Sequence, residues 1–346
     1  MSALLQQRTR QQNSRFAHFS LFSFGLFIVI LVHYNHSPPS TSPPPTATKS
    51  YYLAVIGIQT GFDNPAVVSP LKRPTYNYTG RRHAIRNTWL QSTGTHQNDP
   101  SPLLVRFVIG HSSDATQEQD VGREEASHHD FIRLPLVEDY RSLTNKTMTF
   151  FQTILEHYSF QYVIKVDDDV YLKLHTVPTA ISQWKSHQYD YIGCMKRGQI
   201  FKNPLLRWYE PQHAILGDRE YFSHAWGSLY VLSYNAIARL MKLHPETLRY
   251  FANEDVTVGS WMLVLPVLHY DDRRLCATSC DRDLNAIAVW DYPQCAGLCD
   301  PIHSMARLHS HPSCSLSMAK AWGRGPRAPS SLPMVPPLIR FDLSTQ

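Results

Sequence analysis

An apolar run at residues 162–166 ends directly in three adjacent carboxylates, Asp167, Asp168 and Asp169, and a second apolar run follows at residues 170–172. A near-continuous apolar run is typical of a strand that is buried on both faces of a parallel sheet. Ligands of open α/β sheets bind beyond the carboxyl ends of such strands. The pattern therefore predicts that the three acids face a cleft, where a hard divalent cation would neutralise them and hold a diphosphate. The alternative for a bare run of three Asp residues is a solvated acidic turn.

Two earlier apolar runs, residues 53–58 and 103–109, have the same character, and helical patterns lie between the runs. Residues 142–157 carry apolar side chains at roughly helical spacing, and a segment that contains Trp and Ile follows Pro178. Alternating strands and helices predict an α/β fold with a mostly parallel sheet and helices on both faces. No Gly-x-Gly-x-x-Gly follows the first strand and no Gly-Lys-Ser/Thr loop occurs, so the usual dinucleotide and P-loop sites lose support.

The amino-terminal part of the chain predicts a membrane anchor. Residues 16–34 contain no Asp, Glu, Lys or Arg and are close to the roughly 20 residues that a helix needs to cross a bilayer. Because Arg8, Arg10 and Arg15 precede this segment, the positive-inside rule leaves residues 1–15 in the cytosol and sends the rest into the lumen. A cleaved signal peptide is the main alternative, but its apolar region is usually shorter and ends at small residues.

Beyond the anchor, residues 35–50 are rich in Pro, Ser and Thr and are expected to form a stalk, because such a segment cannot bury a core. Residues 51–314 are long enough for one large catalytic domain, and residues 315–346 form a tail rich in Pro and Ser that is expected to be disordered.

Five of the six cysteines lie between residues 276 and 314, a density that favours disulfides in an oxidising compartment. A zinc site is the alternative, although the spacing of the pairs is Cys-x3-Cys rather than the usual Cys-x2-Cys. Cys194 lies far upstream and could pair with the odd member of this group, but the sequence alone leaves the connectivity open.

The formal net charge of +5 is modest, so nucleic-acid binding is not expected. Basic residues do gather at residues 81–83, and Arg82 and Arg86 lie one helical turn apart, on one face of a helix. Planar guanidinium groups suit phosphate oxygens, so this face could bind phosphate. A structural ion-pair role for the two arginines is an equal alternative.

A second acidic pair, Glu254 and Asp255, precedes an apolar segment and so lies next to buried structure. Transfer of a group from a diphosphate to a hydroxyl needs one carboxylate that takes the hydroxyl proton while a metal stabilises the leaving group. The pair is therefore a candidate general base. The alternative is a helix start at Asn253, Glu254 and Asp255, and both interpretations can hold together.

Ordered stretches along the chain carry a family resemblance. They are residues 54–60 (AVIGIQT), 81–89 (RRHAIRNTW), 105–111 (VRFVIGH), 130–134 (DFIRL), Tyr140 with Lys146 and Thr147, 163–170 (VIKVDDDV), 191–196 (YIGCMK), 230–233 (YVLS) and 253–261 (NEDVTVGSW). Over about residues 53–314, the chain resembles the β-1,3-galactosyltransferase family, especially its plant branch of arabinogalactan β-1,3-galactosyltransferases. The resemblance implies a type II Golgi membrane enzyme with the two-lobed α/β fold called GT-A, which uses UDP-galactose and Mn²⁺.

The resemblance also implies a metal site. Asp167 and Asp169 would flank the metal and the donor, with Asp169 as the direct ligand. A histidine near the carboxyl end completes the metal shell in this family, and the local match selects His309 rather than His303 or His311. Imidazole nitrogen suits Mn²⁺ well enough for this role.

On the acceptor side, the resemblance makes Asp255 the base that activates the acceptor hydroxyl and Glu254 a residue that positions the acceptor. The candidate donor contacts are Arg82, Arg86, Lys165, Asp167 and Asp168. The expected acceptor is a glycan that ends in galactose or a similar sugar.

The chain departs from the family pattern at Leu90, where Gly is frequent, and at residues 226–230, which contain one glycine. Two alternatives remain beside a galactosyltransferase. One is the same fold acting on another donor, such as UDP-N-acetylglucosamine, because nothing in the metal motif recognises the sugar. The other is a non-catalytic Golgi protein that supports another transferase in a complex.

Overall fold

The computed structural model describes residues 49–63, 76–91, 102–139, 142–206, 208–217, 219–280 and 285–315. All of them belong to one unit that spans Thr48–Gln346. The predicted cytosolic tail and anchor lie outside the described residues, as do nearly all of the stalk and the carboxyl-terminal tail. Within the ranges described, no helix is both long enough and apolar enough to cross a bilayer.

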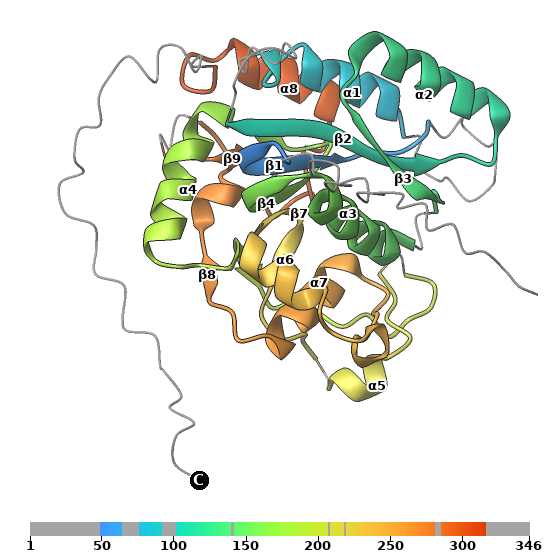
Figure 1. Cartoon of the computed structure of the whole chain (residues 1–346), viewed down its shortest axis with the longest axis vertical. Coiled ribbons are helices and arrows are strands. Elements are labelled where there is room, and N and C mark those ends of the chain that lie inside the picture. Colours follow the sequence, from blue (N-terminus) through green and yellow to red (C-terminus); the bar gives the residue numbers. More distant parts are fainter. Residues whose placement is uncertain are drawn as a thin grey trace, which may run out of the picture. The chain divides into compact units, whose positions relative to one another are not determined.

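A seven-stranded sheet forms the centre of the domain, with the strand order β3-β2-β1-β4-β7-β6-β8 (Figure 1). The strands are β1 (Tyr51–Gln59), β2 (Leu103–His111), β3 (Phe131–Val137), β4 (Ser159–Asp167), β6 (Tyr191–Lys196), β7 (His224–Ser233) and β8 (His269–Asp271). Every neighbouring pair is parallel except that β7 runs antiparallel to both β4 and β6. The prediction of a mostly parallel sheet is therefore confirmed, and the three strands expected from the apolar runs are β1, β2 and β4. A small antiparallel ribbon pairs β5 (Tyr171–Leu172) with β9 (Ala288–Val289).

Helices cover both faces of the sheet, as predicted (Figure 1). One face carries α1 (Tyr78–Arg86), α4 (Val177–Ser186) and α8 (Pro301–Ser310), and the other carries α3 (Leu143–His157), α6 (Tyr234–Leu240) and α7 (Glu254–Val264). α2 (Ala115–His128) lies beside α1, and α5 (His213–Leu216) is a single turn in the loop that follows β6. Short 3-10 helices occur at Leu174–Thr176, Pro245–Thr247 and Arg273–Cys276.

The alternation of side chains along β1 explains this three-layer arrangement. Ile56 and Ile58 point into the core beneath α1, whereas Val55 points into the core beneath α3, because successive side chains of a strand face opposite sides. Gly57 lets α3 approach closely, since a Cβ at this position would overlap the Phe150 ring. β1 is thus buried on both faces, which is why it appears in the sequence as a continuous apolar run.

All six cysteines form disulfides, which confirms the predicted stapling and excludes the zinc alternative. The pairs are Cys194–Cys276, Cys280–Cys314 and Cys295–Cys299. The first joins β6 to the 3-10 helix after β8, and the other two hold the segment around α8. The upstream cysteine therefore pairs with a member of the carboxyl-terminal group, as the sequence allowed.

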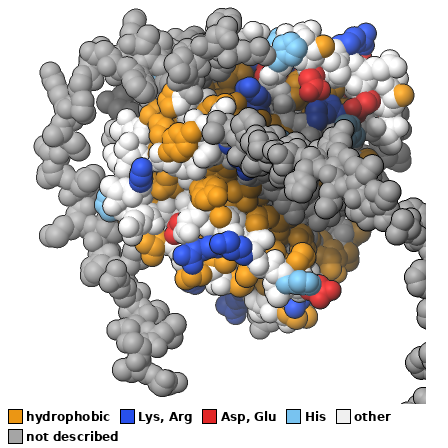
Figure 2. All heavy atoms as spheres, in the orientation of Figure 1, with side chains coloured by type: hydrophobic (Ala, Val, Ile, Leu, Met, Phe, Trp, Pro, Cys, Tyr) orange, Lys and Arg blue, Asp and Glu red, His pale blue; other side chains and the backbone are white. Residues whose placement is uncertain are grey.

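The face of the domain in Figure 2 mixes hydrophobic side chains with dispersed basic ones and few acidic ones. Among the described residues visible on this face, no single large basic patch dominates, in keeping with the modest net charge of +5.

Candidate active site

The predicted site residues meet at the edge of the sheet where β1, β4 and β6 end, which we call the carboxyl edge. Gln59 at the end of β1 is in register with Asp167 at the end of β4. Lys196 at the end of β6 is in register with His224 at the start of β7. Ligands of α/β sheets bind at such an edge. The first turn of α7, which carries Glu254 and Asp255, reaches the same edge, because these two acids contact Lys165 of β4 and Lys196 of β6.

The three adjacent acids continue from β4 and face Arg81 of α1. Arg81 Nη1 donates to Asp168 Oδ1 at 2.8 Å and to Asp169 Oδ2 at 3.2 Å. Its guanidinium also lies over the rings of Tyr76 and Tyr78, 5.6 and 5.7 Å from their centroids. Sequence reasoning missed Arg81, although it stands in the same basic motif as Arg82 and Arg86. Asp168 is therefore buried and shares the Arg81 guanidinium with the partly buried Asp169, which is not the arrangement of a solvated turn.

Two oxygens of this acidic group can accept a cation. Asp168 Oδ2 and Asp169 Oδ1 are buried and have no hydrogen-bond partner among the described residues. Burial, together with the charges of Asp167 and Asp168, raises the pKa of Asp169 to about 8. A hard cation favours carboxylate oxygens and would remove this electrostatic penalty. The donor set therefore fits a divalent metal, although no group of three or more His, Cys, Asp and Glu side chains in the described ranges has the arrangement of a metal site.

His309 lies on α8 and contacts Tyr171, two residues beyond Asp169. Its Nδ1 is 3.0 Å from the Tyr171 hydroxyl, and the side chain borders a cavity of about 610 Å³ between α1 and α8. Asn77, His83 and other residues of the two helices line the rest of this cavity. The structure thus brings His309 to the segment that follows the acids, and its role as a metal ligand stays a prediction.

Lys165 joins the three acids to the second acidic pair. Its Nζ lies 2.5 Å from Asp167 Oδ1, 2.5 Å from the Gly227 carbonyl oxygen and 4.0 Å from Glu254 Oε2. Burial opposes the charged form of Lys165, but Asp167 and Glu254 outweigh it and raise the pKa of the ammonium above its usual value. The donor-side and acceptor-side predictions, which are far apart in the sequence, therefore meet at one buried cation.

Glu254 and Asp255 open α7, so the predicted helix start is confirmed, but their surroundings differ. Glu254 Oε1 accepts from the hydroxyls of Thr147 at 2.8 Å and Tyr230 at 2.6 Å, and burial raises the pKa of Glu254. Asp255 keeps 14% of its side chain exposed, and its Oδ2 lies 2.9 Å from Lys196 Nζ. Burial alone would raise the pKa of Asp255, but Lys196 and then His224 lower it overall. Asp255 is therefore the ionised, accessible carboxylate of the pair.

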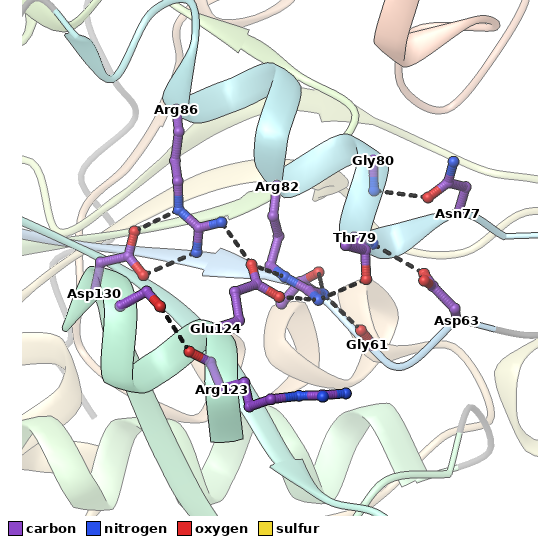
Figure 3. Close-up of polar contacts among 12 residues, drawn as sticks. Gly61, Asp63, Asn77, Thr79, Gly80, Arg82, Arg86, Arg123, Glu124 and Asp130 are labelled. Atoms are coloured by element: carbon purple, nitrogen blue, oxygen red, sulfur yellow. Dashed lines mark hydrogen bonds and ion pairs between the residues drawn. The ribbon is translucent and has the colours of Figure 1, made fainter. Parts of the chain in front are cut away.

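Arg82 and Arg86 are part of a buried ion-pair network between α1 and α2 (Figure 3). Arg82 donates to both carboxylate oxygens of Glu124, at 2.8 and 2.6 Å, and Arg86 donates to both oxygens of Asp130, at 2.8 and 2.9 Å. Arg86 also donates to Glu124 at 2.5 Å. These contacts match the ion-pair alternative, and the donor-binding role of the two arginines stays an untested prediction.

Comparisons with known proteins identify the family of the chain. A family model described as "Galactosyltransferase" matches residues 80–273. The chain is 40% identical over 274 residues to "Probable beta-1,3-galactosyltransferase 12" of Arabidopsis thaliana, covering 77% of this chain and 68% of the relative. It is 39% identical over 268 residues to "Probable beta-1,3-galactosyltransferase 13" of the same organism, covering 77% and 73%.

Among solved structures, the inositol-1-phosphate CTP transferase of T. maritima matches with a TM-score of 0.32 and 10% identity, over 64% of this chain and 86% of that one. So low a score adds nothing to the fold assignment, which rests on the sheet order.

The family match spans all the predicted site residues except His309, which lies beyond residue 273. The chain belongs to the galactosyltransferase family, and it is a glycosyltransferase related to the β-1,3-galactosyltransferases.

Proposed function

We propose that the protein is an inverting β-1,3-galactosyltransferase of the GT-A type. It transfers galactose from UDP-galactose to a hydroxyl of a glycan acceptor whose terminal sugar is galactose or a similar hexose. The observation that carries the proposal is Lys165, whose ammonium lies between Asp167 of the donor side and Glu254 of the acceptor side. A transfer between two substrates needs both sets of groups within one site.

On the donor side, Asp169 Oδ1 and Asp168 Oδ2 supply free carboxylate oxygens, and Asp167 and His309 are the further candidates for holding Mn²⁺. When bound, Mn²⁺ would supply Lewis-acid stabilisation of the departing diphosphate. Arg81 contributes a guanidinium that already reaches the acids and can turn toward phosphate oxygens, because it keeps 15% of its side chain exposed. Lys165 holds the Asp167 carboxylate in place by donating a hydrogen bond to its Oδ1.

On the acceptor side, Asp255 receives the proton of the attacking hydroxyl. It is ionised and partly exposed, as a general base requires. Glu254 is enclosed by Thr147, Tyr230 and Lys165, so its part is to fix the first turn of α7 and thereby the position of Asp255.

The cellular setting belongs to the same proposal. Residues 16–34 have the composition of a signal anchor, and the three disulfides require an oxidising compartment. We therefore assign the protein to the Golgi membrane as a single-pass type II protein with a lumenal catalytic domain.

The test is UDP release by the full-length chain, purified in detergent from a secretory host. With UDP-galactose, Mn²⁺ and a β-galactoside acceptor, release should rise with acceptor, and it should disappear with chelator. Asp255→Asn should lower the rate about 10²- to 10⁴-fold, the range of general base catalysis. Faster turnover of UDP-N-acetylglucosamine would change the donor assignment, and UDP binding without turnover on any donor would refute an enzymatic role.

A further inference from the structure

His224 is a buried side chain beside Asp255 that has no role in the glycosyl transfer proposed above. Its Nδ1 lies 2.8 Å from the Phe222 carbonyl oxygen. A carbonyl can only accept, so Nδ1 carries the proton of the neutral ring and Nε2 carries the lone pair. Nε2 is buried, has no hydrogen-bond partner among the described residues, and lies 3.8 Å from Asp255 Oδ2. An orphaned ring nitrogen therefore faces the oxygen assigned to take the acceptor proton.

The packing around His224 fixes this orientation. Gly259 lies one helical turn after Asp255 in α7, and a Cβ at Gly259 would stand only 2.6 Å from the Cβ of His224. The rings of Tyr221 and Phe222 meet the imidazole edge-on, at centroid distances of 5.8 and 5.9 Å. Because the ring is enclosed on these sides, Nε2 stays directed at Asp255.

The charges around His224 come from two elements. Asp255 on α7 faces Nε2, and Lys196 at the end of β6 donates to the same Asp255 Oδ2 at 2.9 Å. Lys196 also lies 3.8 Å above the centroid of the Trp226 ring, which holds its ammonium in place. The hydroxyl of Tyr221, whose ring contacts the imidazole, is a further titratable group near His224.

This arrangement favours binding of one proton between Asp255 Oδ2 and His224 Nε2. Two acceptors, a carboxylate oxygen and an imidazole lone pair, face each other and repel until a proton lies between them. Lys196 makes Asp255 a poor proton acceptor, which is seen in its lowered pKa. Burial lowers the pKa of His224, so the ring is neutral at the start of a reaction cycle and can accept.

We propose that His224 is the onward proton acceptor of Asp255 during glycosyl transfer. The inference rests on the proposed function, in which Asp255 is the base. The acceptor oxygen bonds to the anomeric carbon of the donor sugar, and the bond from that carbon to the diphosphate breaks with its electron pair on the diphosphate. The hydroxyl proton goes to Asp255 Oδ2 and then to the buried His224 Nε2, and before the next cycle the imidazolium returns it to solvent through the partly exposed Asp255. His224 acts through Asp255 and positions the proton rather than touching the acceptor.

The test compares pH profiles of kcat/KM for wild type and His224→Gln in the full-length chain. Wild type should lose activity on the acid side as His224 becomes protonated, below the ordinary imidazole value of about 6.5. His224→Gln keeps polar atoms in the same space but cannot take a proton. It should lower kcat about 10- to 100-fold, leave the donor KM within about twofold and move the acid limb to lower pH.

His269→Gln is the matched control, because burial lowers the pKa of His269 as well, although this histidine is only half-buried and lies on β8 with the Met262 carbonyl as its contact. It should leave the acid limb unchanged. An unchanged limb or an unchanged kcat in His224→Gln would overturn the inference. If Asp255→Asn is inactive while His224→Gln behaves as wild type, only the inference fails. If Asp255→Asn retains full activity, the proposed function itself fails.

If His224→Gln does not fold, histidine ring ¹⁵N NMR of the wild-type chain gives the answer. The Nε2 resonance of His224 should show an unprotonated nitrogen at neutral pH, and its titration should shift in Asp255→Asn. An Nε2 that is protonated at every pH measured, or a titration that is the same in Asp255→Asn as in wild type, would contradict the relay.

Discussion

Arg82→Met separates a structural role of the basic motif from a phosphate-binding role. Arg82 is fully buried and donates five hydrogen bonds, two to Glu124 and one each to Thr60, Gly61 and Thr79. Removing one partner of a buried ion pair costs about 3–5 kcal/mol, and here the lower end applies because Arg86 still pairs with Glu124.

A loss of about 3 kcal/mol corresponds to a fall in Tm of about 6–12 °C for a domain of this size. The assay is thermal unfolding together with the donor KM at a temperature where the variant is folded. The KM should stay within about twofold of wild type. Arg123→Met is the matched control, since Arg123 lies on the same helix as Glu124 but is 78% exposed in its pair with Asp120. Exposed pairs contribute about 0–1 kcal/mol, so its Tm should change by no more than about 3 °C.

The dependence of Tm on pH below neutrality tests the same ion-pair network in a second way. Burial would raise the pKa of Glu124, but Arg82 and Arg86 lower it overall. A carboxyl whose folded pKa is depressed stabilises the protein above its unfolded value of about 4.5, and this stability is lost as the pH falls. Arg82→Met should therefore show a shallower loss of Tm below that pH. A Tm within about 2 °C of wild type, combined with a donor KM raised at least about tenfold, would refute the structural assignment.

Three further predictions follow from other contacts. Gly297→Ala should reduce acceptor-stimulated UDP release at least about tenfold and weaken its Mn²⁺ dependence, because Gly297 has φ 138° and a Cβ there would overlap Asp169 Oδ1; an unchanged Mn²⁺ titration would contradict this contact. Burial lowers the pKa of His175 to about 4, so the folded protein resists a proton that the unfolded chain takes up below about 6.5. His175→Gln should then flatten the fall in Tm between about pH 7 and pH 5, and a curve parallel to wild type would argue against it. Replacing Cys194 and Cys276 together by Ala should cost about 2–5 kcal/mol, measured by denaturant unfolding under non-reducing conditions; equal midpoints would show that the bridge adds nothing.

The sequence predicted those features that depend on short stretches of chain. The apolar run before Asp167 identified a strand and its carboxyl end, and the acidic pair before residues 256–265 identified a helix start. Both signals are local, because strand burial and helix capping act within a few residues. The order of the elements then indicated a mostly parallel sheet.

Contacts between segments that are distant in the chain could not be predicted from the sequence. The bond from Arg81 to Asp168 spans 87 positions, and nothing in the local pattern distinguishes Arg81 from Arg82. The same limit applies to His224, whose place beside Asp255 depends on Gly259 leaving room for it. A glycine one turn after an acid in a helix was the available signal, but it becomes informative only when the partner strand is known.

The loop closed by Cys295–Cys299 has a consequence for the order in which the protein is made. Within it, the Leu298 amide donates to the Asp169 carbonyl oxygen at 2.7 Å, and Gly297 lies against the carboxylate of Asp169. A ribosome has already synthesised all strands of the central sheet before it reaches this loop. The acid assigned to the donor therefore gains its final surroundings only when synthesis and oxidation are nearly complete. A truncated or reduced product therefore keeps the sequence of the sheet but lacks the final surroundings of Asp169.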